Sequence, residues 1–417
     1  MLPRFIRARQ TFPHRALRDL GAEVRSELAA KQMGSQLKPG ARVAIGAGSR
    51  GIARLPEAVR ATVDHFQSLG AKPLIIPAMG SHGGGTAEGQ RKLLTQLGVS
   101  EEAMGCPVVS SIETVRLGKT AEEIDTVMDR CAFESDGIFL VNRVKPHTTF
   151  EAPIQSGVVK MAAIGLGKVA GATEYHRAAV RLGLGEVVRS VGRHVLASGK
   201  VIGGLALVED AHHAIGRVSA ERAAGLEAQD KELLELAQSW MARLPFGEID
   251  LLIVDEIGKQ YSGTGMDSKI VNRHPYGGAN PWPWAPRVTR IYARELSTCS
   301  YGNAVGIGMA DAISERLYAQ IDWKATLVNA RAASNLTAVR TPVRAANDRE
   351  ALDLLLATVG RRSACEATVV WIRNTLELED VIVSENLFAQ RGTGGAVEAV
   401  GEGFEAEFDD DENLIRA

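Results

Sequence analysis

The chain has 417 residues and a nearly balanced charge, with 48 Lys and Arg against 50 Asp and Glu and a formal net charge of −2. This balance argues against nucleic acid or an anionic membrane as a partner, because proteins that bind them usually carry a basic surplus. A chain of this length is expected to fold as two domains, each large enough for its own hydrophobic core.

The cysteines and the first residues indicate the compartment. The four cysteines are widely scattered and form no CxxC pair, so neither a zinc knuckle nor an iron–sulfur cluster motif is visible. A disulfide framework is therefore not expected, and a reducing cytosol is the natural compartment. Residues 1–19 lack the apolar core of a signal peptide, and no apolar run is long enough to span a bilayer. We expect a cytoplasmic protein.

Short apolar runs alternate with helical patterns in the first half of the chain. The predicted strands are Val43–Gly46, Leu74–Ile76, Ile138–Val141 and Val201–Val208. Apolar residues at helical spacing predict a helix over 55–69, and Thr86 is a suitable N-cap for another helix that ends at Leu97. This alternation predicts an α/β fold with a doubly wound, mostly parallel sheet.

A second domain is predicted after residue 245. A long helix over 220–244 is broken by Pro245, Phe246 and Gly247. The boundary divides a larger N-terminal domain, 1–245, from a smaller C-terminal α/β domain, 246–417. Strands are predicted there at Leu251–Asp255, Ala304–Met309, Thr368–Ile372 and Val381–Val383. The acidic tail over 402–413 is expected to fray in solvent.

Polar residues follow three of the predicted strands. Arg50, His82 and His147 each come after a strand of the first domain. In an open parallel sheet, the loops that leave the carboxyl ends of the strands line one edge, where ligands bind. These residues would share that edge if their three strands are near neighbours.

The stretch from Asn142 to Arg177 is the most informative part of the chain. It holds His147, Lys160 and His176 among glycines and small residues, which allow close approach of a backbone to a ligand. Taken singly, each histidine could be an ordinary loop or helix-surface residue, and Lys160 could be a phosphate-binding lysine. Taken together with His82, these residues favour an active site.

Four sequence blocks resemble the nickel-dependent lactate racemase family in order and spacing. The blocks are GSHGGGTAE, NRVKPH, SGVVKM and ATEYH, and the resemblance is sharpest from Gly80 to His176. It implies a nickel-pincer nucleotide attached covalently to Lys160, with His176 as the nickel ligand. It also implies that residues 1–245 form the catalytic and cofactor-binding domain and that the domain over 246–417 closes over the active site. His82 and His147 would be the acid–base pair.

Chemical reasoning is consistent with these implied roles. Removing the C2 hydrogen of a 2-hydroxy acid as a proton would build a second negative charge beside the carboxylate. Removing it as a hydride leaves a neutral ketone carbon, provided that a base takes the hydroxyl proton and an electrophilic cofactor holds the hydride. Two bases then serve the two enantiomers, and histidine suits this with an unperturbed pKa of about 6.5. Imidazole also suits nickel.

The remaining predicted contacts concern the carboxylate and the cofactor. A substrate carboxylate needs a cation, ideally a guanidinium. Arg50 matches an arginine of the family's first loop, and Arg273 is a second candidate with Asn272 as a hydrogen-bonding neighbour. Ser49 and Gly157 are predicted as further cofactor contacts.

The chain also departs from the family pattern. Ala47 replaces an aspartate, Val158 and Val159 replace a glycine pair, Leu166 replaces a proline, and Gly83 replaces an arginine. These changes affect the pocket and the surroundings of the cofactor, so the resemblance implies a substrate other than lactate. Extra room over 83–85 would suit a larger or differently charged hydroxy acid.

Two other classes of function stay open. His82, His147 and His176 could hold zinc in a hydrolase or lyase, since three histidines are enough for an open catalytic site, although Lys160 then has no clear role. The chain could also be a non-catalytic homologue that binds the hydroxy acid or the cofactor. The expected partners are a small-molecule 2-hydroxy acid and the cofactor-synthesis proteins, and the oligomeric state, including a homo-oligomer, is left open.

Overall fold

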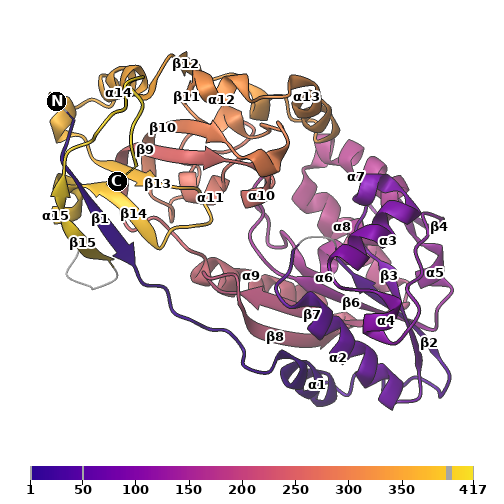
Figure 1. Ribbon diagram of the computed structural model, residues 1–417. Helices are drawn as coiled ribbons and strands as arrows, with labels where there is room; N and C mark the ends of the chain where they lie inside the picture. The colour runs from indigo at the N-terminus through magenta and orange to yellow at the C-terminus, as the bar shows by residue number, and fades with distance from the viewer. Residues whose placement is uncertain (1, 49–50, 391–396, 417) are drawn as a thin grey trace. The chain divides into compact units, whose positions relative to one another are not determined.

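The computed structural model describes residues 2–48, 51–390 and 397–416, which form two compact units (Figure 1). One unit comprises residues 13–241. The other comprises residues 1–12 together with 242–417. Residues 1–12 thus belong to the unit that contains the C-terminal part of the chain, whereas the predicted division into 1–245 and 246–417 placed them in the N-terminal domain.

The unit over 13–241 is built on a five-stranded sheet with the strand order β3-β2-β6-β7-β8. Its strands are β2 Arg42–Ala47, β3 Lys72–Pro77, β6 Gly137–Arg143, β7 Val201–Glu209 and β8 Ile215–Arg222. The first four are parallel, and β8 pairs antiparallel with β7. The prediction of a mostly parallel sheet is confirmed.

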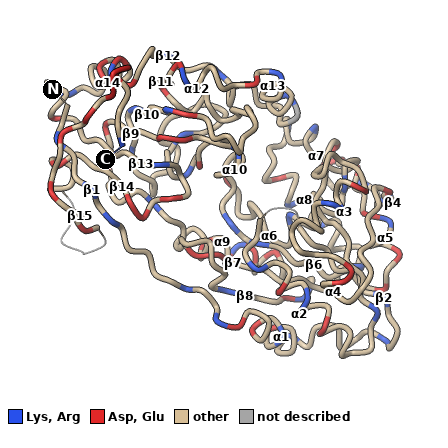
Figure 2. The backbone as a smooth tube through the Cα atoms, viewed as in Figure 1, with Lys and Arg blue, Asp and Glu red and all other residues tan. Residues whose placement is uncertain are grey.

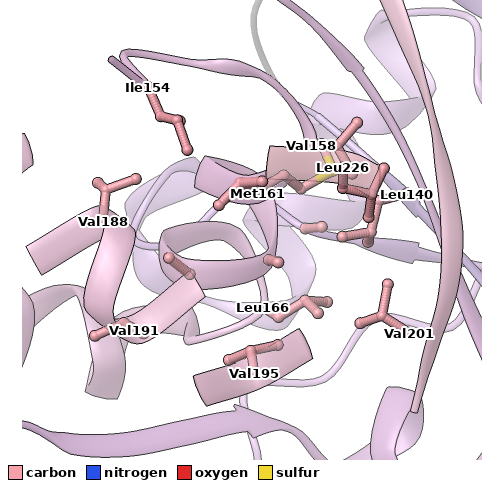
Figure 3. Packing of buried hydrophobic residues seen from close by; sticks show 14 of the residues in the cluster. Leu140, Ile154, Val158, Met161, Leu166, Val188, Val191, Val195, Val201 and Leu226 are labelled. Carbon is pink, nitrogen blue, oxygen red and sulfur yellow. The ribbon is translucent and has the colours of Figure 1, made fainter. Parts of the chain in front are cut away.

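Helices cover both faces of this sheet. One face packs against α1 Leu20–Ala30, α2 Leu55–Ser68 and α3 Ala87–Gln96. The other packs against α6 Gly157–Lys160, α7 Lys168–Leu182, α8 Leu184–Ala197 and α9 Leu226–Trp240 (Figure 3). Side chains of β2 alternate between the two cores, with Val43 and Ile45 on the first and Ala44 on the second. Burial on both faces explains why these strands are continuous apolar runs.

The helix termini follow local sequence signals. The Thr86 side chain accepts a hydrogen bond from the Gly89 N–H and caps α3, as predicted. α6 continues through a π-helical turn, Met161–Gly165, toward α7. The remaining elements are a hairpin of β4 Thr114–Lys119 and β5 Asp125–Asp129 and the short helices α4 Glu101–Met104 and α5 Arg130–Phe133.

The predicted helix over 220–244 is wrong at its start. Residues 215–222 form strand β8, and α9 begins only at Leu226. Ile215, Val218 and Ala220 are buried in the core of the sheet. Pairing with β7 and this burial outweigh the helical propensity of the Ala- and Glu-rich sequence.

The second unit holds an eight-stranded mixed sheet with the order β12-β11-β10-β9-β13-β14-β1-β15. Its strands are β1 Phe5–Gln10, β9 Glu248–Ile257, β10 Arg287–Leu296, β11 Ala312–Ser314, β12 Val343–Ala345, β13 Val369–Ile372, β14 Asp380–Ser384 and β15 Val397–Phe404. Its helices are α10 Lys259–Ser262, α11 Ser268–Val271, α12 Glu315–Ala319, α13 Trp323–Ala332, α14 Asp348–Leu356 and α15 Glu385–Ala389.

Strand β1 explains why the first twelve residues belong to this unit. It lies between β14 and β15 and pairs antiparallel with both. Phe5 is buried, and its ring meets Trp371 edge-on with centroids 6.4 Å apart. The chain therefore begins inside one unit, forms the whole of the other, and returns.

Two further predictions for this unit are wrong. Residues 304–309 form turns and a short 3₁₀ helix rather than a strand, because Gly306 adopts φ +101° and approaches the Thr264 carbonyl too closely for a side chain. The acidic tail does not fray: β15 includes residues 402–404, and Leu414 is buried. The carbonyl of Leu414 accepts a hydrogen bond of 2.6 Å from Arg294.

Charge is mixed along both units, as Figure 2 shows for the Lys, Arg, Asp and Glu residues. Many of these residues form ion pairs within helices or between neighbouring strands, such as Arg60 with Asp64. Within the described ranges, no helix combines the length and the apolar character that a bilayer-crossing segment requires.

We expect Phe5→Ala to destabilise the unit that contains β1 by about 3–5 kcal/mol, because truncation leaves a cavity beside Trp371. Urea unfolding followed by tryptophan fluorescence measures this loss. Arg9→Ala, on the same strand but exposed, is the control and should change stability little. Equal effects of the two variants would contradict the assignment of β1 as a core strand.

Candidate active site

The strands that precede three of the predicted site residues are adjacent. β3, β2 and β6 are neighbours and parallel, so the loops after them leave the same edge of the sheet. The condition for a shared edge is therefore met. Ser49 and Arg50, which follow β2, lie outside the described residues.

The loop after β3, which carries His82, packs against the helical segment that follows Lys160. The Gly80 N–H donates to the Gly165 carbonyl at 3.2 Å. A Cβ on Gly80 would lie 3.3 Å from the Ile164 carbonyl oxygen, so the two backbones are in close contact. His82 itself is exposed.

A buried glutamine fixes the backbone of this loop. The Gln90 side chain donates to the carbonyls of Gly80 at 2.8 Å and His82 at 3.3 Å. Gln90 is fully buried, and it also receives a hydrogen bond of 3.4 Å from the ammonium of Lys168. The position of His82 is thus tied to the start of α7.

Lys168 forms a buried ion pair that sequence reasoning missed. Its Nζ lies 2.9 Å from the Asp129 carboxylate and donates to the Pro77 carbonyl at the end of β3 at 2.6 Å. Both charged side chains are almost completely inaccessible to solvent. The sequence contained one indication of this buried pair, which is a single lysine among the small and apolar residues of GLGKVAG. Breaking such a pair leaves an uncompensated buried charge, which costs about 3–5 kcal/mol.

The loop after β6 orients His147. Its backbone N–H donates to the Gln155 side-chain oxygen at 2.8 Å. Its ring centroid lies 4.5 Å from that of Phe150. Nδ1 accepts from the Thr149 N–H at 3.2 Å, so a neutral His147 carries its proton on Nε2.

Lys160 lies against the same loop. Its Nζ donates to the Gln155 carbonyl at 3.0 Å and sits 5.0 Å from the centre of the Phe150 ring. Gln155 and Phe150 thus each contact both Lys160 and His147. Gln155 is buried, so this connection is shielded from solvent.

Gly157 occupies the first position of α6, three residues before Lys160. It adopts φ +90°, and a Cβ there would come within 2.5 Å of the Asp230 carboxylate. Its carbonyl accepts a hydrogen bond of 2.7 Å from the Asn142 side chain at the end of β6. The predicted glycine is therefore required by the backbone of this segment.

His176 on α7 is electrostatically coupled to Lys160. Partial desolvation lowers the pKa of the His176 imidazole, although the residue lies at the surface of the helix, and the positive charge of Lys160 lowers that pKa further. A lowered pKa favours the neutral form of the imidazole, which has a lone pair that can bind a metal. Lys160 and His176 are thus near enough for the charge of the lysine to affect the imidazole.

Asn272 and Arg273 belong to the other unit, where both have structural partners. The Asn272 amide nitrogen donates to the carbonyls of Trp282 at 3.1 Å and Pro286 at 2.9 Å, and its oxygen accepts from the Trp282 N–H at 3.0 Å. The Arg273 guanidinium donates to the Val288 carbonyl at 2.6 Å and forms an ion pair with Asp311. These contacts hold their own loop in place.

The extra room expected over 83–85 is not found at two of its three positions. A Cβ on Gly83 would lie 2.6 Å from the backbone of Gly89, and one on Gly85 would lie 2.7 Å from Val169. Gly84 faces open space. These glycines allow the loop to pack tightly, and they do not enlarge a pocket.

The histidines do not form a protein-only metal site. Within the part of the chain that the structure describes, no three His, Cys, Asp or Glu side chains are grouped closely enough to hold a metal ion. His82, His147 and His176 are all described, so the arrangement does not support a three-histidine zinc centre.

Comparison with solved structures identifies the fold. The lactate racemase apoprotein from Thermoanaerobacterium thermosaccharolyticum matches with a TM-score of 0.54 and 13% identity, over 88% of this chain and 94% of that chain. A protein from Thermotoga maritima matches with a TM-score of 0.50 and 13% identity, over 79% and 85% of the respective chains. No protein-family model and no curated protein matches the sequence. The chain has a two-domain α/β fold similar to that of the lactate racemase apoprotein.

We expect Lys160→Met to raise the pKa of His176, because it removes the neighbouring positive charge while keeping most of the side-chain volume. Titration of the histidine ring resonances by NMR measures the change.

Lys145→Met provides a reciprocal control. Lys145 lowers the pKa of His213, so its loss should raise that pKa and leave His176 unchanged. An unaltered His176 titration in Lys160→Met would mean that the two site residues are not neighbours.

Proposed function

We propose that the protein is a racemase or epimerase of a 2-hydroxy acid that works by reversible hydride transfer with a nickel-pincer nucleotide bound at Lys160. The observation that carries the proposal is the pair of contacts that Lys160 and His147 share, with Gln155 and with Phe150. The His82 loop packs against the helical segment that follows Lys160. The similarity of the fold to a lactate racemase apoprotein supports the proposal.

The residues present fit such a group. Lys160 is partly exposed at the end of α6, and covalent attachment would replace the hydrogen bond from its amine to the Gln155 carbonyl. The lowered pKa of His176 favours the neutral imidazole, which is the form that binds nickel. Since the described side chains form no three-ligand cluster, the remaining donors would come from the organic group itself.

When bound, this group would supply an electrophilic centre that takes up the C2 hydride of the substrate and returns it to either face. The protein's contribution is to move the hydroxyl proton. His147 in the tautomer described above presents an N–H at Nε2, which can donate a hydrogen bond to the substrate oxygen. Transfer of a proton to that oxygen would require the imidazolium form, in which Nδ1–H donates to the Thr149 hydroxyl. His82 would then be the partner that accepts the proton from the opposite enantiomer.

The substrate carboxylate still requires a cation. Arg273 directs its guanidinium to backbone carbonyls and Asp311, so it is the weaker candidate. We propose that Arg50 binds the carboxylate, because it follows β2, the central strand of the three whose loops leave this edge.

The attachment is tested by intact mass and nickel content of protein made in a host that also makes the cofactor. We expect a mass adduct on the wild type together with bound nickel, and loss of both in Lys160→Ala. Lys231→Ala removes a surface lysine of α9 and should keep both. Wild-type protein without adduct or nickel would contradict the proposal, and full activity of Lys160→Ala with bound zinc would favour a hydrolase or lyase.

The hydride step is tested separately with a panel of paired 2-hydroxy acid enantiomers in heavy water. We expect interconversion of one pair, with the C2 hydrogen largely retained, because a hydride held by the cofactor does not exchange with solvent. Mass spectrometry of the product measures retention. Extensive deuterium at C2 would indicate proton abstraction instead. Bound cofactor with no interconversion across the panel would identify a binding homologue without turnover.

A further inference from the structure

A buried carboxylate on α9 contacts the start of the helix that carries Lys160. Asp230 is 1% exposed, and its Oδ2 accepts a hydrogen bond of 2.7 Å from the Val159 N–H, while Oδ1 accepts one of 3.2 Å from the Val158 N–H. These N–H groups lie in the first turn of α6, where no intrahelical acceptor exists for them. The carboxylate therefore acts as an N-terminal cap that comes from a distant part of the sequence.

The residue at the N-cap position of α6 does not cap the helix with its own side chain. Ser156 is the N-cap residue, but its hydroxyl accepts from the Lys145 N–H at 2.7 Å and donates to the Lys145 carbonyl at 2.7 Å. Ser156 thus holds the preceding loop to the chain after β6. Asp230 accepts hydrogen bonds from the Val158 and Val159 N–H groups, which the Ser156 side chain does not cap.

Gly157 makes the contact possible. Its φ of +90° turns the chain into the helix, and any Cβ there would overlap both oxygens of the Asp230 carboxylate. The glycine and the carboxylate are therefore complementary, and changing either should disturb the same contact.

Lys160 is one residue beyond Val159. The orientation of its side chain depends on the first turn of α6 and on the Nζ hydrogen bond to the Gln155 carbonyl. We propose that Asp230 is a positioning residue for Lys160, which it holds in place by capping the first turn of α6. The inference rests on the role proposed for Lys160 above, but it concerns the geometry of the apoprotein.

The electrostatics of Asp230 give this contact a pH dependence. Burial raises the pKa of Asp230 to about 7, and the hydrogen bonds from Val159 and Val158 lower it only in part. No charged side chain contributes to this shift. Because the folded-state pKa is raised, the ionised cap exists mainly above about pH 7. Below that pH the protonated carboxyl keeps one full acceptor, so the first turn is held less firmly.

The experiment measures the reactivity of Lys160 toward acetic anhydride in the full-length apoprotein, at a series of pH values on both sides of neutrality. Lys92, an exposed lysine of α3, is the internal reference, and peptide mass spectrometry quantifies both sites. In the wild type we expect the relative reactivity of Lys160 to change near pH 7. In Asp230→Asn, the relative reactivity of Lys160 above pH 7 should be about two- to tenfold higher than in the wild type, which is the factor for losing one ordinary hydrogen bond. The change near pH 7 should be absent in this variant.

The matched control is Glu227→Gln, which removes one negative charge from the same helix. Glu227 pairs with Arg193 and Lys231, whereas the N–H groups of Val158 and Val159 donate to Asp230. This variant should keep the wild-type profile. If Asp230→Asn does not fold, Gly157→Ala tests the same contact from the other side and should also raise the reactivity.

Two outcomes would overturn the inference. If the pH dependence of Lys160 reactivity is the same in the wild type, Asp230→Asn and Gly157→Ala, the cap does not control the position of the lysine side chain. An inflection that persists in Asp230→Asn but disappears in His176→Gln would assign the pH dependence to the imidazole beside Lys160. Because the labelling uses apoprotein, failure of cofactor attachment is a separate result and leaves this test intact.

Discussion

The helical segment from α6 to α7 is held at the carboxyl edge of the five-stranded sheet by buried polar contacts, and the candidate site depends on them. Asp230 caps its start, and the ion pair of Lys168 with Asp129 fixes the point where α7 begins. Between these anchors, Met161 and Ala162 pack into the apolar core. A buried charge without its partner costs about 3–5 kcal/mol, so the anchors resist rearrangement more strongly than a surface pair would.

Much of the first unit could be predicted because its strands have one simple property. Residues such as Ile45 and Leu140 lie in strands that are buried on both faces, which produces apolar runs bounded by glycine and by helical patterns. Strand β8 was not predicted, because it is an edge strand with an Ala- and Glu-rich end that resembles the start of a helix. The place of the first twelve residues was not predicted either, because pairing of β1 with β14 and β15 is a long-range contact that no local pattern encodes.

For the site, the sequence identified candidate polar residues, but it did not show which of them have structural hydrogen-bond partners. The adjacency of β3, β2 and β6 meets the condition for a shared edge. The roles assigned to Lys160 and His176 stay predictions. Asn272 and Arg273 stood in a polar, glycine-rich segment that resembled a binding loop, yet their hydrogen bonds close that segment on itself. Asp230 could not be found from sequence, because an acidic residue in a helix is usually solvated and only the tertiary fold brings it to α6.

The coupling of Lys160 with His176 has a consequence for the order of assembly. An ammonium beside an imidazole disfavours its protonation, so in the apoprotein Lys160 helps to keep His176 neutral. A lysine whose nitrogen is converted to an amide loses its charge. Attachment of that kind would remove the repulsion and make His176 more basic, which strengthens imidazole as a donor to a metal. In the function proposed above, the charge of Lys160 therefore opposes protonation of His176 only until the lysine nitrogen is modified.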